Sequence, residues 1–170
     1  MAQLLVDENG NYLTECPLCD KTLAQPIFAT THFIEDPADK LWAYSDAGMH
    51  WQCYADWKYQ ARFAKQYFDA VANPHYKNPY WPTVLALPEI HINANCELEP
   101  PVADVHLQAI GPGIRVDVSQ WEKWLAGGFR DQCVHSLQLS AYSAAVSRIQ
   151  SELPTSQSVK DAFTAAKEAT

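Results

Sequence analysis

The sequence has no long hydrophobic segment. No run of about 18 or more apolar residues occurs in its 170 residues, which argues against a membrane-spanning helix. The opening residues, MAQLLVDENGNYL, carry acids where a secretory signal carries basic residues before an apolar core. We therefore expect a cytoplasmic protein that has no membrane partner.

Basic residues are also scarce. Twelve Lys and Arg stand against 20 Asp and Glu, and the formal net charge is −8. Proteins that bind nucleic acids usually carry a basic stripe, because neutralising phosphates releases counterions and supplies much of the affinity. The composition therefore argues against a nucleic-acid partner. Residues 1–56 hold nine acids and two lysines, a distribution that serves solubility or favours rapid association with a basic protein.

Patterns typical of common catalytic sites are missing as well. The sequence contains no G-x-S-x-G, H-E-x-x-H, P-loop or G-x-G-x-x-G motif. Several other histidines and cysteines have no partner nearby in the sequence that would complete a site: His75, His91, His106, His135, Cys96 and Cys133. A buried, unreactive thiol is the usual role of such cysteines. These observations predict a protein that is not an enzyme.

Five cysteines are present, and two of them form the C-x-x-C pair CPLC. In a cytosolic chain such a pair more often binds metal or has a redox role than forms a structural disulfide. A second pair of donors with the same spacing follows about thirty residues later, in DAGMHWQC. The four predicted zinc ligands are Cys16, Cys19, His50 and Cys53. Because four protein donors fill a tetrahedral zinc site and leave no position for water, the predicted ion is structural.

Other interpretations of these residues stay open. CPLC could be a thioredoxin-like redox pair, although residues 20–23 lack the helical pattern that should follow such a motif. His50 could instead cap or pack, and His32 could then replace it as the fourth ligand. For Cys53 we expect a stabilised thiolate, because the N–H groups at the beginning of a helix favour negative charge.

The hydrophobic pattern predicts an α+β fold with antiparallel strands. The expected strands are a hairpin at 4–13 and further strands at 26–34, 40–45, 83–98, 103–110 and 113–118. Gly111-Pro112-Gly113 is expected to form the turn between the last two of these strands. The expected helices lie at 50–71, 120–126 and 133–153.

These elements suggest three parts of the chain. Residues 1–73 would form a zinc treble clef, in which a knuckle and a β-hairpin are followed by a helix. This module would pack on residues 74–153, an antiparallel sheet with two further helices. Residues 154–170 are rich in Ser, Thr, Ala and Lys, and we expect them to form a weakly ordered tail.

CPLC followed after about thirty residues by DAGMHWQCYADW resembles small bacterial zinc-binding treble-clef proteins. Some of these are similar to immunity proteins of polymorphic toxin systems. The resemblance covers residues 16 to about 70, and GIRVDVSQWEKWL matches less closely. It implies a non-enzymatic binding protein with a structural zinc ion and a cognate toxin as its protein partner. The zinc ligands it implies are Cys16, Cys19, His50 and Cys53. The acidic charge of the chain suits a basic toxin.

The same motif is similar in outline to an HNH endonuclease, in which His32 would activate water. The sequence departs from that pattern in three ways. No acid directly precedes His32, no basic run follows it, and Cys53 is not followed by a further histidine suited to hold the catalytic metal. The immunity protein is therefore the main prediction, and a degenerate HNH-type nuclease and a zinc-stabilised adaptor are the alternatives.

Overall fold

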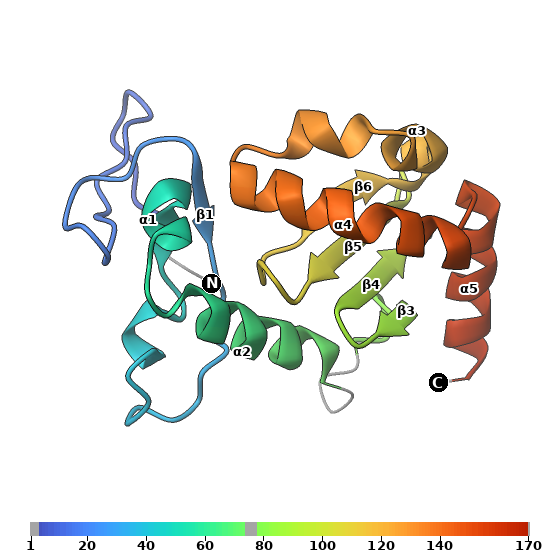
Figure 1. The fold of residues 1–170 in the computed structure, drawn as a ribbon, viewed down its shortest axis with the longest axis horizontal. Helices are drawn as coiled ribbons and strands as arrows, with labels where there is room; N and C mark the ends of the chain where they lie inside the picture. Colours follow the sequence, from blue (N-terminus) through green and yellow to red (C-terminus); the bar gives the residue numbers. More distant parts are fainter. Residues whose placement is uncertain (1–3, 74–77, 170) are drawn as a thin grey trace.

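The computed structural model describes residues 4–73 and 78–169 (Figure 1). Within these ranges it contains five α-helices and two antiparallel sheets, so the predicted mixture of helices and antiparallel strands is confirmed. The strands are β1 (Ile27–Ala29), β2 (Gly48–His50), β3 (Thr83–Leu87), β4 (Ile90–Asn95), β5 (Val102–Leu107) and β6 (Ile114–Asp117). The α-helices are α1 (Trp51–Ala55), α2 (Gln60–Ala72), α3 (Trp121–Leu125), α4 (Ser136–Glu152) and α5 (Ser156–Glu168). Short 3-10 helices are η1 (Trp42–Tyr44), η3 (Val118–Gln120) and η4 (Gly128–Gln132).

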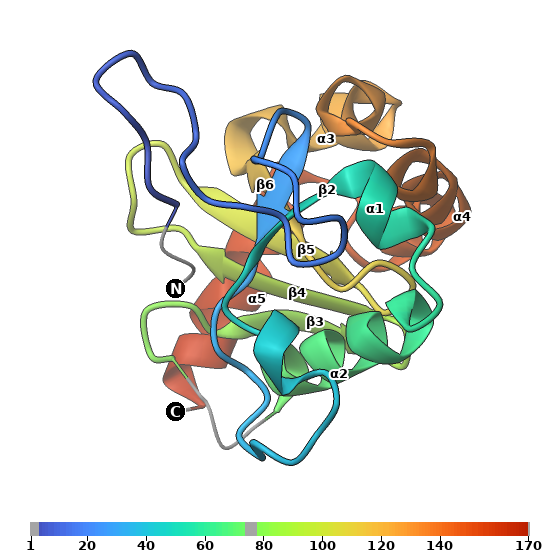
Figure 2. The same ribbon diagram turned by 90° about the vertical axis from the view of Figure 1, so that its left-hand side faces the viewer.

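The first expected hairpin is present as a small bridged turn. Val6 and Tyr12 form an isolated antiparallel bridge, and the N–H of Leu13 donates to the carbonyl of Leu5 at 2.8 Å. Gly10 closes the turn with a φ of 81°, in the region that glycine enters without steric cost. This N-terminal segment projects from the rest of the molecule in Figure 2.

The prediction of a strand at 40–45 is wrong. This stretch contains η1, and β1 pairs instead with β2, so that Ile27 lies opposite His50. The carboxylate of Asp39 accepts a hydrogen bond from the N–H of Leu41 at 2.8 Å, which favours a turn here. The apolar pattern of 40–45 is therefore used to bury Leu41 rather than to build a strand.

The single helix expected at 50–71 is two helices, α1 and α2, separated at 56–59. Trp57 lies in this break, and its ring packs 4.6 Å from that of Tyr44 and 5.4 Å from that of Phe63. Phe63 belongs to the N-terminal hydrophobic core, and Trp57 and Tyr44 pack against that core. The packing of Trp57 against these two rings thus accompanies the break in the helix at 56–59, which costs about one helical turn.

The second sheet is a meander with the strand order β3-β4-β5-β6. Every neighbouring pair is antiparallel, and β5 and β6 are joined across Gly111-Pro112-Gly113 as predicted. One face of the sheet is apolar, and Ile92, Val105 and Val116 on this face are buried against α3, α4 and α5. In Figure 1, α4 lies across this face.

Three contacts join the N-terminal half to the loop between β5 and β6. The hydroxyl of Tyr54 donates to the carbonyl of Ile110 at 2.9 Å, and the amide of Gln60 donates to the carbonyl of Ala109 at 3.0 Å. Gly111 has a φ of 77°, and a Cβ at this position would lie 3.1 Å from Cα of Ala64. Close packing therefore requires glycine here.

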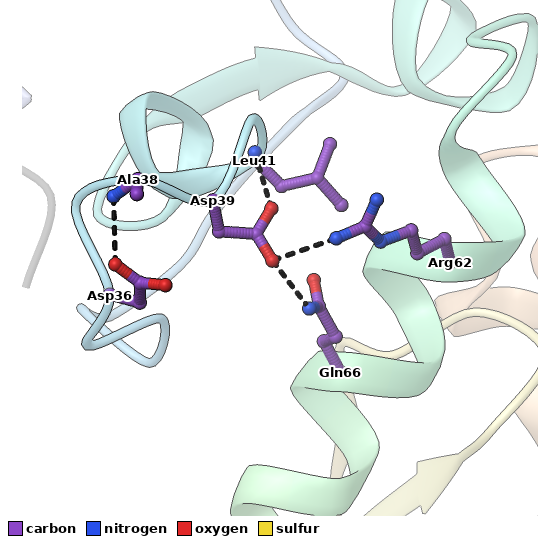
Figure 3. A network of polar contacts seen from close by, with 6 residues as sticks. All are labelled: Asp36, Ala38, Asp39, Leu41, Arg62 and Gln66. Atoms are coloured by element: carbon purple, nitrogen blue, oxygen red, sulfur yellow. Dashed lines mark hydrogen bonds and ion pairs between the residues drawn. The ribbon is translucent and has the colours of Figure 1, made fainter.

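A polar network ties the loop at 36–41 to α2 (Figure 3). The carboxylate of Asp39 accepts hydrogen bonds from the guanidinium of Arg62 at 2.7 Å and from the amide of Gln66 at 3.1 Å. The N–H of Leu41, the amide of Gln66 and the charge of Arg62 together lower the pKa of Asp39. The ionised form of Asp39 is therefore favoured by folding.

We expect Asp39→Asn to destabilise the protein at neutral pH, because it removes the charge that Arg62 and Gln66 contact. The pKa of Asp39 is lower in the folded chain than in the unfolded one. Its contribution is thus fully present above the unfolded pKa, about 3.9, and is lost as the pH falls through the folded value. Urea unfolding at a series of pH values should show the difference between the wild type and the variant shrinking below about pH 4.

The matched control is Asp36→Asn. The carboxylate of Asp36 accepts a hydrogen bond from the N–H of Ala38 at 2.8 Å in the same loop (Figure 3). Because no ion pair of Asp36 occurs among the described residues, a smaller loss at neutral pH is expected. An Asp39→Asn effect that stayed constant down to pH 3 would contradict the role given to its charge.

Residues 154–170 were expected to form a weakly ordered tail, but residues 156–168 form α5. The side chain of Thr155 accepts a hydrogen bond from the N–H of Ser158, and the side chain of Ser158 accepts one from the N–H of Thr155, which is a capping box. Val159 and Phe163, one helical turn apart, are buried in the core on the apolar face of the sheet.

In the described ranges no helix is both long and apolar enough to cross a membrane.

Replacing Phe163 with Ala is expected to lower the free energy of unfolding by about 3 to 5 kcal/mol, because it leaves a cavity in the core. The control is Lys160→Ala on the exposed side of α5, which should change this free energy by less than about 0.5 kcal/mol. Thermal and urea unfolding of both variants measure the difference. Equal stability of the two variants would mean that α5 contributes little to the core.

Candidate metal centre

Backbone hydrogen bonds close the loop that carries the first two thiols. The N–H of Cys16 donates to the carbonyl of Lys21 at 2.9 Å, and the N–H of Cys19 donates to the carbonyl of Cys16 at 3.2 Å. Glu15 and Thr22 form an antiparallel bridge at the base of the loop. The C-x-x-C pair thus lies on a tight turn that places its two sulfur atoms near one point.

The other two candidate ligands come from the junction between β2 and α1. His50 is the last residue of β2 and the N-cap residue of α1, and Cys53 lies in the first turn of that helix. Residues three positions apart lie on the same side of a helical turn. The pairing of β1 with β2 fixes where this junction lies relative to the first loop.

The four predicted ligands converge. Their ligand atoms all lie within 4.8 Å of one another. Nδ1 of His50 lies 3.5 Å from Sγ of Cys19 and 3.8 Å from Sγ of Cys53. Cys16 is fully buried, and the other three residues are partly buried. This cluster of three cysteines and one histidine could hold a metal ion.

Without an ion, Cys19 and Cys53 differ in the acidity of their thiols. A backbone hydrogen bond at Lys21 lowers the pKa of Cys19, whereas burial and the neighbouring Cys19 and Cys16 raise the pKa of Cys53 to about 12. The thiolate expected at Cys53 is therefore not favoured in the metal-free protein. A cation would replace the thiol protons, and metal binding to such sites accordingly releases protons and weakens at low pH.

The imidazole of His50 is oriented by its second nitrogen. Nε2 accepts a hydrogen bond from the N–H of Ala24 at 3.0 Å. A neutral ring that accepts at Nε2 carries its proton on Nδ1, the nitrogen that faces the sulfur atoms. Ligation through Nδ1 would require the proton to move to Nε2 and the N–H of Ala24 to find another acceptor.

The cluster lies at the edge of the N-terminal hydrophobic core. Cys16 belongs to this core together with Phe28, Trp51 and Tyr54. The ring of Phe28 lies 4.8 Å from that of Trp51 and 4.5 Å from that of Tyr54. Cys53 also packs against this group, so apolar rings shield one side of the cluster from water.

His32, the alternative ligand, is not part of the cluster. Its Nδ1 lies 3.3 Å from the hydroxyl of Ser45, and its ring packs edge-on against Trp42. Cys96 and Cys133 are partly buried thiols that pack against the C-terminal core. The sequence prediction for His75 falls outside the described residues.

A second polar group was not singled out from the sequence. It lies on the face of the large sheet opposite the apolar core and consists of Thr83, Asn93, Asp104 and Arg115. Each of these residues has apolar residues before and after it in the sequence. Because successive side chains of a strand point to opposite faces, this alternation is typical of a strand with one face in the core and the other outside it. The pairing between strands that brings them together is not visible in the sequence.

Comparisons with protein-family models, with curated proteins and with solved structures give no match. The class that the structure itself defines is a mixed helix and sheet protein with a candidate Cys3His metal centre.

Purified protein is expected to contain about one zinc ion per chain, because three thiols and one imidazole are the donors that tetrahedral zinc prefers. Cys16→Ser and Cys53→Ser should each lower the zinc content to well below one ion per chain in elemental analysis. The matched control is Cys96→Ser, which changes a thiol outside the cluster and should leave the content unchanged. Full zinc retention by Cys16→Ser would show that the metal is held elsewhere.

Proposed function

We propose that this chain is a non-enzymatic binding protein of the cytoplasm that neutralises a cognate bacterial toxin by direct contact. In this proposal the cluster of Cys16, Cys19, His50 and Cys53 holds a structural zinc ion. The order of elements around it supports a treble clef, since the thiol-bearing turn and the β1–β2 hairpin are followed by α1. Because all four donors come from the chain, zinc here would have no open position for catalysis.

The proposal of a basic protein partner is carried by the surface of the projecting hairpin and the loop beside it. Glu8, Glu15 and Asp20 are exposed there. Leu5 and Leu13, joined by the backbone hydrogen bond between them, are 59% and 61% exposed. These exposed acids would attract a basic partner to this surface, and the two leucines would supply apolar contact area once the partner has bound.

If a toxin gene lies beside the gene for this chain, its product is the partner to test. It is expected to bind the purified protein, with an association rate that falls as ionic strength rises. Glu8→Lys combined with Glu15→Lys should slow association by about tenfold. The matched control reverses two exposed acids elsewhere, Glu89→Lys with Glu168→Lys, and should leave the rate nearly unchanged. Surface plasmon resonance measures these rates.

Two results would overturn the proposal. One is the absence of binding to the neighbouring toxin together with full toxicity when both genes are expressed. The other is metal-dependent cleavage of DNA by the purified chain that is lost in His32→Ala, which would favour the HNH-type nuclease instead.

A further inference from the structure

A row of polar side chains crosses all four strands of the large sheet. Thr83 pairs with Asn93, Asn93 with Asp104, and Asp104 with Arg115 in the register of the strands. Directly paired residues of antiparallel strands project from the same face and lie about 5 Å apart. The neighbouring register row, which includes Ile92 and Val105, projects into the apolar core instead. The row is therefore a continuous polar strip on the other face.

A cleft lies over this polar row. Its volume is about 930 Å³, and its apolar wall includes Val71 of α2 and Ala86 of β3. Binding sites for small molecules usually measure about 300 to 1,000 Å³ and combine apolar walls with a few polar groups. A second cavity, of about 600 Å³, shares Asp104 and Arg115 with the first and continues toward β1. The row therefore lines a space of the size that a small ligand needs.

Hydrogen bonds fix the orientation of the Asn93 amide. The hydroxyl of Thr83 donates to Oδ1 of Asn93 at 3.2 Å, and Nε2 of His91 lies 3.0 Å from the same oxygen. An amide oxygen only accepts, so His91 must donate here. Burial and the nearby His106 lower the pKa of His91, which keeps its ring neutral at pH 7. The amide NH₂ of Asn93 has no partner among the described residues and remains available as a donor.

Arg115 pairs with Asp104 in the cleft. Its Nε and Nη2 donate to the two carboxylate oxygens of Asp104 at 3.0 and 3.2 Å, and the guanidinium lies 5.3 Å from the ring centre of Trp81. The guanidinium has five N–H groups, so three remain after this pairing. The side chain of Arg115 is 67% exposed. It is the one lysine or arginine among the described residues that line either cavity.

The polarity of these groups defines a ligand class. Arg115 and Asn93 offer N–H donors, and both oxygens of Asp104 already accept from Arg115. We propose that this cleft binds a small molecule that carries a carboxylate or phosphate group on a flat apolar body. The oxyanion accepts from the guanidinium of Arg115, and the apolar body lies near Trp81 and the wall of the cleft. Asn93, on the far side of Asp104 in the same row, offers a further N–H donor to the ligand. The cleft is lined by none of the four candidate metal ligands and by no residue of the projecting hairpin, so this proposal does not depend on the proposed function.

Three probes with the same naphthalene body test the ligand class: 2-naphthoate, 2-naphthyl phosphate and the neutral 2-naphthamide. Isothermal titration calorimetry with the full, metal-loaded chain is expected to show binding of at least one of the two anions. The amide should bind about tenfold more weakly, because a neutral carbonyl cannot form an ion pair with the guanidinium. The anion that binds more tightly distinguishes a carboxylate from a phosphate ligand. Equal affinity for the amide, or no binding of either anion, overturns the proposal.

Two variants locate the binding site. Arg115→Met should weaken anion binding by about tenfold, and Asn93→Asp, which keeps the shape of the side chain, should weaken it by opposing the anion with a second negative charge. The control is Arg130→Met, because Arg130 lies over the ring of Phe129 at 4.8 Å in a similar pair outside both cavities. Wild-type affinity in both Arg115→Met and Asn93→Asp overturns the proposal. Zinc content measured in the same samples reports separately on the metal centre.

Discussion

Three sulfur atoms and one imidazole lie at the edge of the N-terminal core, and no two of their ligand atoms lie more than 4.8 Å apart. Such crowding restricts the charge that the cluster can carry. Without a cation, burial and then the neighbouring thiols oppose a negative charge on Cys53 and raise its pKa. A divalent cation reverses this effect and allows all three sulfur atoms to be thiolates. Because Cys16 is fully buried in the N-terminal core, the charge of the cluster and the packing of that core depend on each other.

The large sheet separates two kinds of surface. Its apolar face, with Ile92 and Val105, is covered by α3, α4 and α5 and accounts for most of the C-terminal core. Its polar face, with Asn93 and Asp104, faces a cleft bounded partly by α2. The period of two residues in a strand makes both surfaces from the same short segments. The apolar face of the large sheet thus contributes to stability, and its polar face lines the cleft proposed to bind a ligand.

The parts that could be predicted from the sequence are those encoded by local spacing. The four candidate ligands follow from two C-x-x-C-like spacings, and the β5–β6 hairpin follows from Gly111-Pro112-Gly113. The strand expected at 40–45 failed because the side chain of Asp39 bonds to the backbone and favours a turn. Helix α5 was missed because a composition rich in Ser, Thr and Ala hid a capping box and a buried pair one turn apart. The polar row was missed because strand register joins residues that are distant in sequence.

The loop between β5 and β6 is held from the N-terminal half at three successive residues, Ala109, Ile110 and Gly111. Two of these contacts use backbone carbonyls, so they do not depend on the side chains of the loop. Tyr54, which makes one of them, is the residue after Cys53 in α1. The two hydrophobic cores are therefore in direct contact through this loop. If they unfold as one unit, a ligand that binds only the folded N-terminal half adds its binding free energy to the stability of the sheet as well, although it touches no strand of that sheet.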